Sequence, residues 1–81
     1  MELFAKLGTL KDLAPESDAV QAWVKHLQDY ITANYYRCTN QILAGLGEMY
    51  AGGGSMTENI DAAGGPGTGE FARDAIRIYC K

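Results

Sequence analysis

The segment from about Glu16 to Asn34 places the strongest constraint on the fold, because its apolar residues recur at helical spacing. Pro15 and the acids Glu16 and Asp18 suit the first turn of a helix, where free N–H groups and the helix dipole favour negative charge. The apolar positions repeat every 3.6 residues, and polar side chains take the opposite face. They are Val20, Trp23, Val24, Leu27, Tyr30 and Ile31. The sequence therefore predicts an amphipathic helix here.

Weaker patterns predict helices on both sides of this segment. Near the N-terminus, one helical face is formed by Leu3, Phe4, Leu7 and Leu10. A third helix is expected to run to about Ala51, capped by Thr39 or Asn40, whose side chains can accept a bond from a free N–H. With Leu43 at its edge, its inward face is predicted to be Ile42, Leu46, Met49 and Tyr50.

Two shorter helices are predicted in the C-terminal part. Ser55 to Glu58 has the S-x-x-E form of a capping box and should start a helix through Ala63. Glycines and Pro66 then break the chain, and Thr68 is expected to cap the last helix. The apolar face of that helix is Phe71, Ala72, Ala75, Ile76 and Tyr79. With no convincing strand anywhere, we expect an all-α domain of four to five helices.

Gly45 and Gly47 interrupt the third predicted helix and are unfavourable there by propensity. They can mark the close approach of another backbone, or they can leave room for a ligand. The first interpretation is favoured, since isolated helix glycines usually have a packing reason.

Length and charge narrow the possible functions. A chain of 81 residues allows a single domain, 1–81, with a marginal core. Its net charge of −3 argues against direct contact with nucleic acid. No apolar run reaches the roughly 20 residues that span a bilayer, and no signal peptide is recognised, so a cytoplasmic location without membrane contact is expected. Cys38 and Cys80 should then be free thiols.

No set of residues predicts catalysis, a metal or a cofactor, so an enzyme is not expected. His26 is isolated, and the glycine-rich stretch 64–69 lacks the lysine of a phosphate-binding loop. Glu48 and Asp61 are best interpreted as solvated acids. Cys38, beside Arg37 and just before a helix, is either a nucleophile for electrophilic ligands or, as we favour, a small buried apolar side chain.

The aromatic residues are more informative. Seven large rings, five of them tyrosines, fall in or beside the predicted helices: Trp23, Tyr30, Tyr35, Tyr36, Tyr50, Phe71 and Tyr79. Each can be an ordinary core residue, which composition alone favours. Yet so many hydroxyls need partners or solvent. A cleft lined by such rings meets that need and suits flat heteroaromatic molecules.

Three blocks of the chain resemble the TipAS antibiotic-recognition domain. They are residues 36–50 (YRCTNQILAGLGEMY), residues 57–61 (TENID), and Gly65-Pro66-Gly67 leading into residues 72–76 (ARDAI). Their order and spacing match the tail of the family and cover about half of the chain. The combination of GLGEMY with T-x-N-I-D is fairly specific.

This resemblance implies a globin-like helical fold at the C-terminus of MerR-type transcriptional regulators. There the domain follows a DNA-binding winged helix and a dimerising coiled coil, so the full-length regulator is expected to be a homodimer. Family members recognise thiopeptides and other cyclic antibiotics in a cleft between helices. Binding orders a loosely structured N-terminal part and switches on resistance promoters. Some members are also made as a free domain that sequesters the drug.

Two differences from the family affect the expected site. Gly45 stands where the family can carry a cysteine that captures dehydroalanine-containing ligands, which leaves only Cys38 for covalent capture. The family's Asp-x-Arg-Phe-Thr block is here GGSMT at residues 53–57, which changes the expected ligand class. The chain is also shorter at its N-terminus than a full member, so we expect a fragment lacking N-terminal helices or a minimal version.

We therefore expect a non-covalent effector sensor for thiopeptide-like or other multidrug ligands, with DNA bound by a separate domain. The alternatives are a helical protein-interaction or dimerisation module and a stand-alone drug-sequestering protein. The predicted ligand-binding residues are Trp23, Tyr30, Tyr36, Cys38, Leu46, Tyr50 and Phe71.

Overall fold

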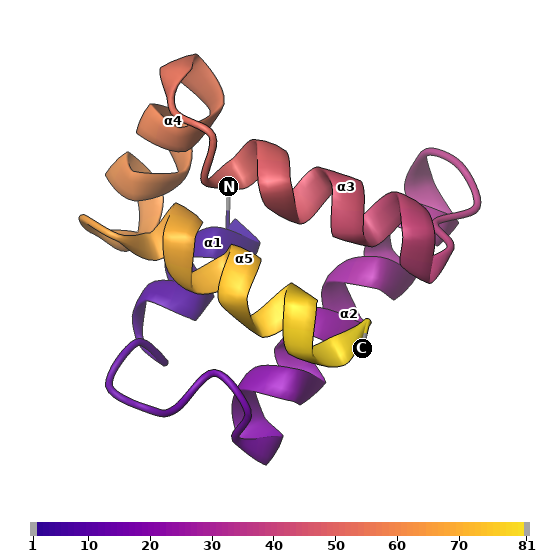
Figure 1. The fold of residues 1–81 in the computed structure, drawn as a ribbon, viewed down its shortest axis with the longest axis horizontal. Coiled ribbons are helices and arrows are strands. Elements are labelled where there is room, and N and C mark those ends of the chain that lie inside the picture. Colours follow the sequence, from indigo (N-terminus) through magenta and orange to yellow (C-terminus); the bar gives the residue numbers. More distant parts are fainter. Residues whose placement is uncertain (1, 81) are drawn as a thin grey trace.

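Five α-helices form the protein in a computed structural model that describes residues 2–80 (Figure 1). Their bounds are α1 Glu2–Gly8, α2 Asp18–Asn34, α3 Asn40–Tyr50, α4 Gly54–Gly64 and α5 Thr68–Tyr79. The described residues contain no strand, and none of their helices is long and apolar enough to cross a membrane. The predicted all-α class and helix number are confirmed.

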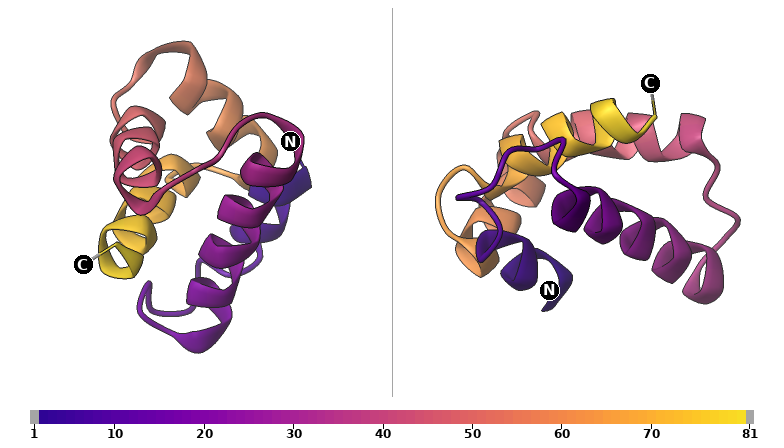
Figure 2. Two further views of the ribbon diagram at one scale, coloured as in Figure 1. Left: turned by 90° about the vertical axis from the view of Figure 1, so that its right-hand side faces the viewer. Right: turned by 90° about the horizontal axis from the view of Figure 1, so that it is seen from below.

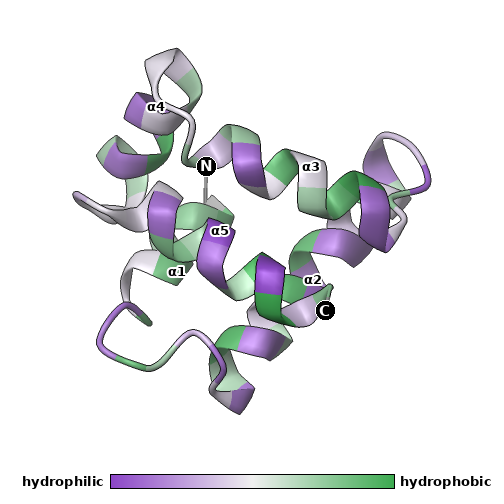
Figure 3. Ribbon diagram, in the orientation of Figure 1, coloured by the Kyte–Doolittle hydropathy of each residue, from purple (hydrophilic) through white to green (hydrophobic). Residues whose placement is uncertain are grey.

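The helices are arranged in two layers with α4 at one end. Antiparallel α3 and α5 lie side by side and form one layer, and α1 and α2 form the other (Figures 1 and 2). α4 packs against α1 and the start of α5. Hydrophobic and hydrophilic residues alternate along the helices, as expected where each helix buries one face (Figure 3). α2 packs mainly on α5. On the side that faces α1, the C-terminal half of α2 borders an open space.

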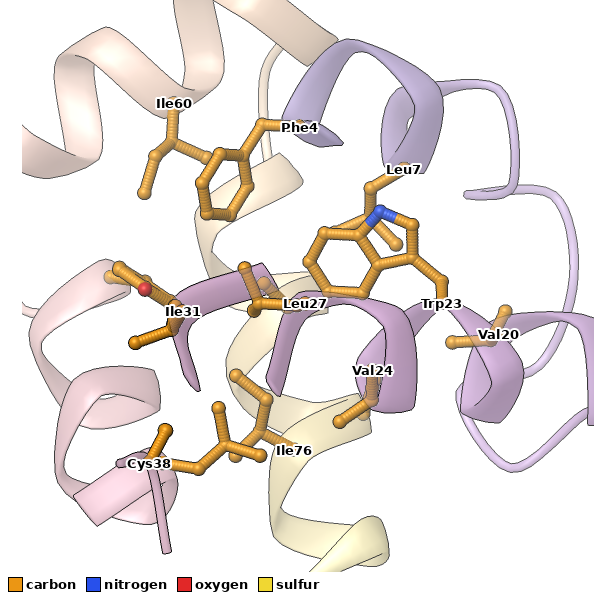
Figure 4. Close-up of a cluster of buried hydrophobic side chains, with 14 residues drawn as sticks. Phe4, Leu7, Val20, Trp23, Val24, Leu27, Ile31, Cys38, Ile60 and Ile76 are labelled. Atoms are coloured by element: carbon orange, nitrogen blue, oxygen red, sulfur yellow. The ribbon is translucent and has the colours of Figure 1, made fainter. Parts of the chain in front are cut away.

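α2 confirms the predicted amphipathic pattern apart from one residue. Its buried side chains are Val20, Trp23, Val24, Leu27 and Ile31 (Figure 4). The helix begins at Asp18, later than predicted, because Ser17 is the N-cap and its hydroxyl accepts a bond from the Val20 N–H at 3.4 Å. Tyr30, which was placed on the apolar face, is 44% exposed. The Tyr30 ring therefore lies at the protein surface instead of in the core.

The predicted inward face of α3 was right for Tyr50 and in part for Leu46, which packs against the core, but wrong for Ile42 and Met49. The buried residues are Leu43, Gly47 and Tyr50, whereas Ile42 and Met49 are exposed. Because Gly47 has no side chain, α3 approaches α5 so closely that a Cβ at this position would lie 3.1 Å from a side-chain carbon of Ile76. The face of α3 that packs on α5 therefore contains Gly47 and not Ile42 or Met49.

The remaining predictions for α3 hold in part. Of the two predicted caps, Thr39 and Asn40, Thr39 is the N-cap, and its hydroxyl accepts a bond from the Ile42 N–H at 3.3 Å. The close-approach interpretation is confirmed for Gly47 only. Gly45 is exposed, and a Cβ there would meet no atom within 4 Å.

α4 does not begin with the predicted capping box. Ser55 lies inside the helix, and the N-cap is Gly53, which makes no side-chain cap bond. Gly53 and Gly54 both have positive φ, a conformation that glycine adopts at little cost. The Thr57 hydroxyl instead secures this turn, because it accepts from the Gly53 N–H and donates to the Tyr50 carbonyl, both at 2.9 Å.

The predicted cap of α5 was also wrong. Thr68 is the first helical residue and is buried, and its hydroxyl donates to the Gly65 carbonyl at 2.7 Å. The N-cap is Gly67, in the left-handed region. A carboxylate oxygen of Asp61, on α4, accepts the Gly69 N–H at 2.9 Å. The free N–H group of α5 is thus satisfied by a neighbouring helix rather than by a local side chain.

Candidate functional site

An open groove with a volume of about 720 Å³ lies between α1, the C-terminal half of α2 and the end of α3. We call it the aromatic groove, because four of its lining residues carry aromatic rings other than imidazole. Its lining residues are Leu3, Phe4, Lys6, His26, Leu27, Tyr30, Ile31, Tyr35 and Tyr50. Pockets that bind small molecules usually measure about 300–1,000 Å³ and are mostly apolar. The groove has the size and lining of such a pocket.

The end of α2 forms one wall of the aromatic groove. Leu27, Tyr30 and Ile31 are spaced three and four residues apart and share one face of the helix. After Asn34 the chain leaves the helical conformation at Tyr35, whose N–H still bonds to the Ile31 carbonyl. This turn sets the Tyr35 ring edge-on against the Tyr30 ring, with centroids 6.2 Å apart. The pair presents two phenols at the open side of the groove.

The floor of the groove belongs to the core. Phe4 and Tyr50 are buried, and their rings meet edge to face with centroids 5.2 Å apart. Burial raises the pKa of Tyr50 to about 12, and the neighbouring Cys38 and Tyr36 add to the shift. Tyr50 therefore stays protonated at neutral pH.

A second hollow of about 450 Å³ adjoins the groove along the seam between α1 and α2. It shares Leu3, Lys6 and His26 with the aromatic groove. The other lining residues of this seam hollow are Leu10, Ala19, Ala22 and Trp23. The Trp23 indole N–H donates to the Leu3 carbonyl at 2.8 Å, and the Trp23 ring packs edge-on against Phe4 (Figure 4). Trp23 thus fixes α1 on α2 and forms a wall of the hollow.

The seven residues predicted from sequence are only partly brought together. Tyr30 and Tyr50 line the aromatic groove, and Trp23 lines the seam hollow. The other four line neither space: Tyr36, Cys38, Leu46 and Phe71.

Sequence reasoning missed the contribution of α1 and of Tyr35. Leu3 and Phe4 fell on a predicted helical face but were not chosen as site residues, although both line the groove. Tyr35 was counted among the aromatic residues, but nothing in the pattern separated it from Tyr36.

Both cysteines are free thiols placed away from the groove. Cys38 is buried, and desolvation raises its pKa, which disfavours the thiolate needed for nucleophilic attack. Its Sγ lies 3.8 Å from the Thr39 carbonyl oxygen. The Cys80 thiol donates to the Asn40 carbonyl at 3.3 Å. These positions favour the interpretation of Cys38 as a buried apolar side chain.

The acids considered above have separate structural partners. Glu48 on α3 accepts two bonds of 2.7 Å from Arg77 on α5, and this pairing lowers the pKa of Glu48. Asp61 caps α5, so the two carboxylates do not form a pair. Among the described residues, no group of three or more His, Cys, Asp or Glu side chains is placed to hold a metal ion.

Comparisons with known proteins point to one family. The TipAS antibiotic-recognition domain matches residues 1–79. The HTH-type transcriptional activator mta of Bacillus subtilis (strain 168) is 33% identical over 78 residues, which cover 96% of this chain and 30% of that protein. The HTH-type transcriptional activators TipA of Streptomyces coelicolor and Streptomyces lividans are each 38% identical to this chain over 78 residues. The match covers 93% of this chain and 30% of each TipA protein.

The chain thus spans about 30% of the length of these curated relatives. No solved structure matches it significantly. The family match extends over nearly the whole chain and agrees with its all-α fold. The chain belongs to the TipAS antibiotic-recognition domain family.

Proposed function

We propose that this domain binds a planar or cyclic antibiotic non-covalently in the aromatic groove and serves as the effector sensor of a MerR-type transcriptional activator. The relatives are transcriptional activators, and the family is described by antibiotic recognition. In such a regulator a separate domain would contact DNA in the cytoplasm, and the full-length protein would act as a homodimer.

The observation that carries this proposal is the open Tyr30–Tyr35 ring pair above an apolar floor. Tyr35 is 72% exposed, although a large ring gains free energy by leaving water. A flat ligand that covers both phenols and contacts Leu27 and Ile31 would bury this area while the hydroxyls stay hydrated or bonded. The lining includes no cysteine, so binding at this site would be non-covalent.

The position of α1 links this site to a response. α1 has seven residues, and a helix of that length is not stable alone in water. A ligand that contacts Leu3 and Phe4 would stabilise the docked state of α1, in agreement with the ordering on binding that the resemblance implies. The stabilisation follows from mass action, because the ligand binds only the assembled groove.

The test is a thermal-shift and calorimetric screen of this domain against thiopeptides and other planar or macrocyclic antibiotics. At 100 times its dissociation constant, a ligand adds about 2.7 kcal/mol to the free energy of unfolding. For a domain of this size, the unfolding midpoint should rise by about 11–22 °C. Intrinsic fluorescence of Trp23, at the seam beside the groove, gives a second signal.

Two adjacent tyrosines provide a matched pair of variants. Tyr35 and Tyr36 are both exposed, but only Tyr35 lines the groove. Tyr35→Ala should weaken ligand binding by about tenfold or more, as for an aromatic hot spot, while Tyr36→Ala should leave the affinity within about twofold. Far-ultraviolet circular dichroism should be unchanged in both variants.

Two other results would contradict the proposal. A ligand that loses affinity only with Tyr36→Ala would move the site to the sequence-based choice of residues. A folded domain that no compound in the panel stabilises, and that associates as its concentration rises, would favour the protein-interaction module.

A further inference from the structure

We infer, building on the proposed function, that the aromatic groove selects planar ligands that carry an anionic group, such as a carboxylate, a sulfonate or an ionised phenol. Lys6 on α1 and His26 on α2 would hold that group. Both residues line the aromatic groove and also the seam hollow, so they stand where the two spaces meet. A ligand that lies along the seam would pass both of them.

The placement of His26 and Lys6 relative to the aromatic rings suits this role. On α2, His26 follows Trp23 by three residues and precedes Tyr30 by four, so the imidazole lies between the two rings on one side of the helix. Lys6 lies in the last turn of α1, three residues after Leu3, which also lines both spaces. The Lys6 and His26 side chains therefore lie beside apolar and aromatic lining residues, and one ligand can contact both.

The charges around the site add a second argument. The chain carries ten acids against seven bases, yet none of the described side chains that line either space is a carboxylate. The Lys6 ammonium borders these apolar linings, so it would attract an anionic group on a ligand that lies against them. A cationic ligand would meet a charge of the same sign.

A merely structural role for Lys6 is also available. A basic residue in the last turn of a helix interacts favourably with the helix dipole whether or not a ligand is present. The two roles differ in one observable property. A structural lysine affects all ligands equally, whereas a recognition lysine affects only those that carry a negative charge.

Two dyes with the same ring system make this distinction. 1-Anilinonaphthalene-8-sulfonate carries a sulfonate, and N-phenyl-1-naphthylamine lacks it. Each is titrated by fluorescence into the 81-residue chain and into variants that share its circular dichroism spectrum. Lys6→Glu should weaken binding of the sulfonate dye by roughly tenfold, because an attraction and a repulsion each change affinity by about two- to fivefold at a partly exposed site. The neutral dye should stay within about twofold.

The control is Lys25→Glu, at an exposed lysine of α2 that lines neither space. It makes the same change in net charge and should leave both dyes within about twofold. His26→Leu removes an imidazole donor and should weaken only the sulfonate dye, by about two- to fivefold. Raising the salt concentration should weaken the sulfonate dye and spare the neutral one.

The outcomes separate this inference from the proposed function. If Tyr35→Ala weakens both dyes but Lys6→Glu changes both equally or neither, the groove remains a binding site and anion selection is wrong. If Lys25→Glu acts as strongly as Lys6→Glu, only net charge matters and the inference is also overturned. If neither dye binds, or Tyr35→Ala has no effect on either, the groove itself is not the site and both ideas fail.

Discussion

Replacing Gly45 and Gly47 by alanine, one at a time, separates helix propensity from the close packing of α3 on α5. Each substitution should gain about 1 kcal/mol from propensity. At Gly45 the new Cβ meets no atom within 4 Å, so Gly45→Ala should stabilise the fold by about that amount. At Gly47 the Cβ would lie 3.1–3.3 Å from three carbons of Ile76, which is 1% exposed and β-branched and therefore has little freedom to move. Such overpacking costs about 1–3 kcal/mol.

The difference between the two variants cancels the shared propensity gain. Gly45→Ala should exceed Gly47→Ala in free energy of unfolding by about 1–3 kcal/mol, and Gly47→Ala should lie between neutral and about 2 kcal/mol less stable than the wild type. Urea denaturation followed by circular dichroism at 222 nm measures both, with equal m values as the check on the unfolded state. If the two variants are stabilised to within about 0.5 kcal/mol of each other, α5 can retreat from α3 at no cost, and the explanation of the α3 face that packs on α5 is refuted.

Two further predictions concern the cap of α5 and the floor of the groove. Asp61→Ala should lower the free energy of unfolding, measured in urea, by about 0.5–2 kcal/mol because the Gly69 N–H loses its acceptor. Asp61→Asn keeps a side-chain oxygen and should lose less. Equal losses in the two variants would refute the role of that oxygen. Tyr50→Phe should remove an ionisation step near pH 12 from the alkaline absorbance titration at 295 nm. Burial raises the Tyr50 pKa above the ordinary tyrosine value of 10, so the contribution of Tyr50 to stability is complete below pH 10 and is lost as the pH rises toward 12. Tyr50→Phe should therefore lose stability less steeply than the wild type between pH 10 and 12.

Periodicity was sufficient to predict the helices, because each helix buries one face against the others. The regular repeats in α2 and α5 were recovered, and residue type alone placed the cap of α3 at Thr39 or Asn40, of which Thr39 is the N-cap. The starts of α4 and α5 were not, although Ser55 and Thr68 are good capping residues by type. Glycines with positive φ and contacts from another helix determine those two starts, and a local pattern cannot show either.

The candidate site could be predicted only as a type of surface. The abundance of tyrosine indicated amphipathic rings that need solvent or polar partners, and Tyr30 meets that need as a groove residue. The choice between Tyr35 and Tyr36 depends on the backbone at the end of α2, where Tyr35 leaves the helix with φ −128° and ψ −69°. Tyr35 and Tyr36 therefore face different surroundings, although they are adjacent in the sequence.

Under the proposed function, the docking of α1 and the binding of a ligand in the aromatic groove are coupled. Leu3 and Phe4 line the groove only while α1 is docked, and docking depends on tertiary contacts, such as the Trp23 hydrogen bond and the packing of Gly8 against Gly64. A ligand can shift this equilibrium only by its difference in affinity for the docked and undocked states. By the same linkage, a substitution that loosens the Gly8–Gly64 contact should weaken ligand binding without touching the ligand. Under the proposed function, the stability of docked α1 would thus set how much of the intrinsic ligand affinity this domain can express.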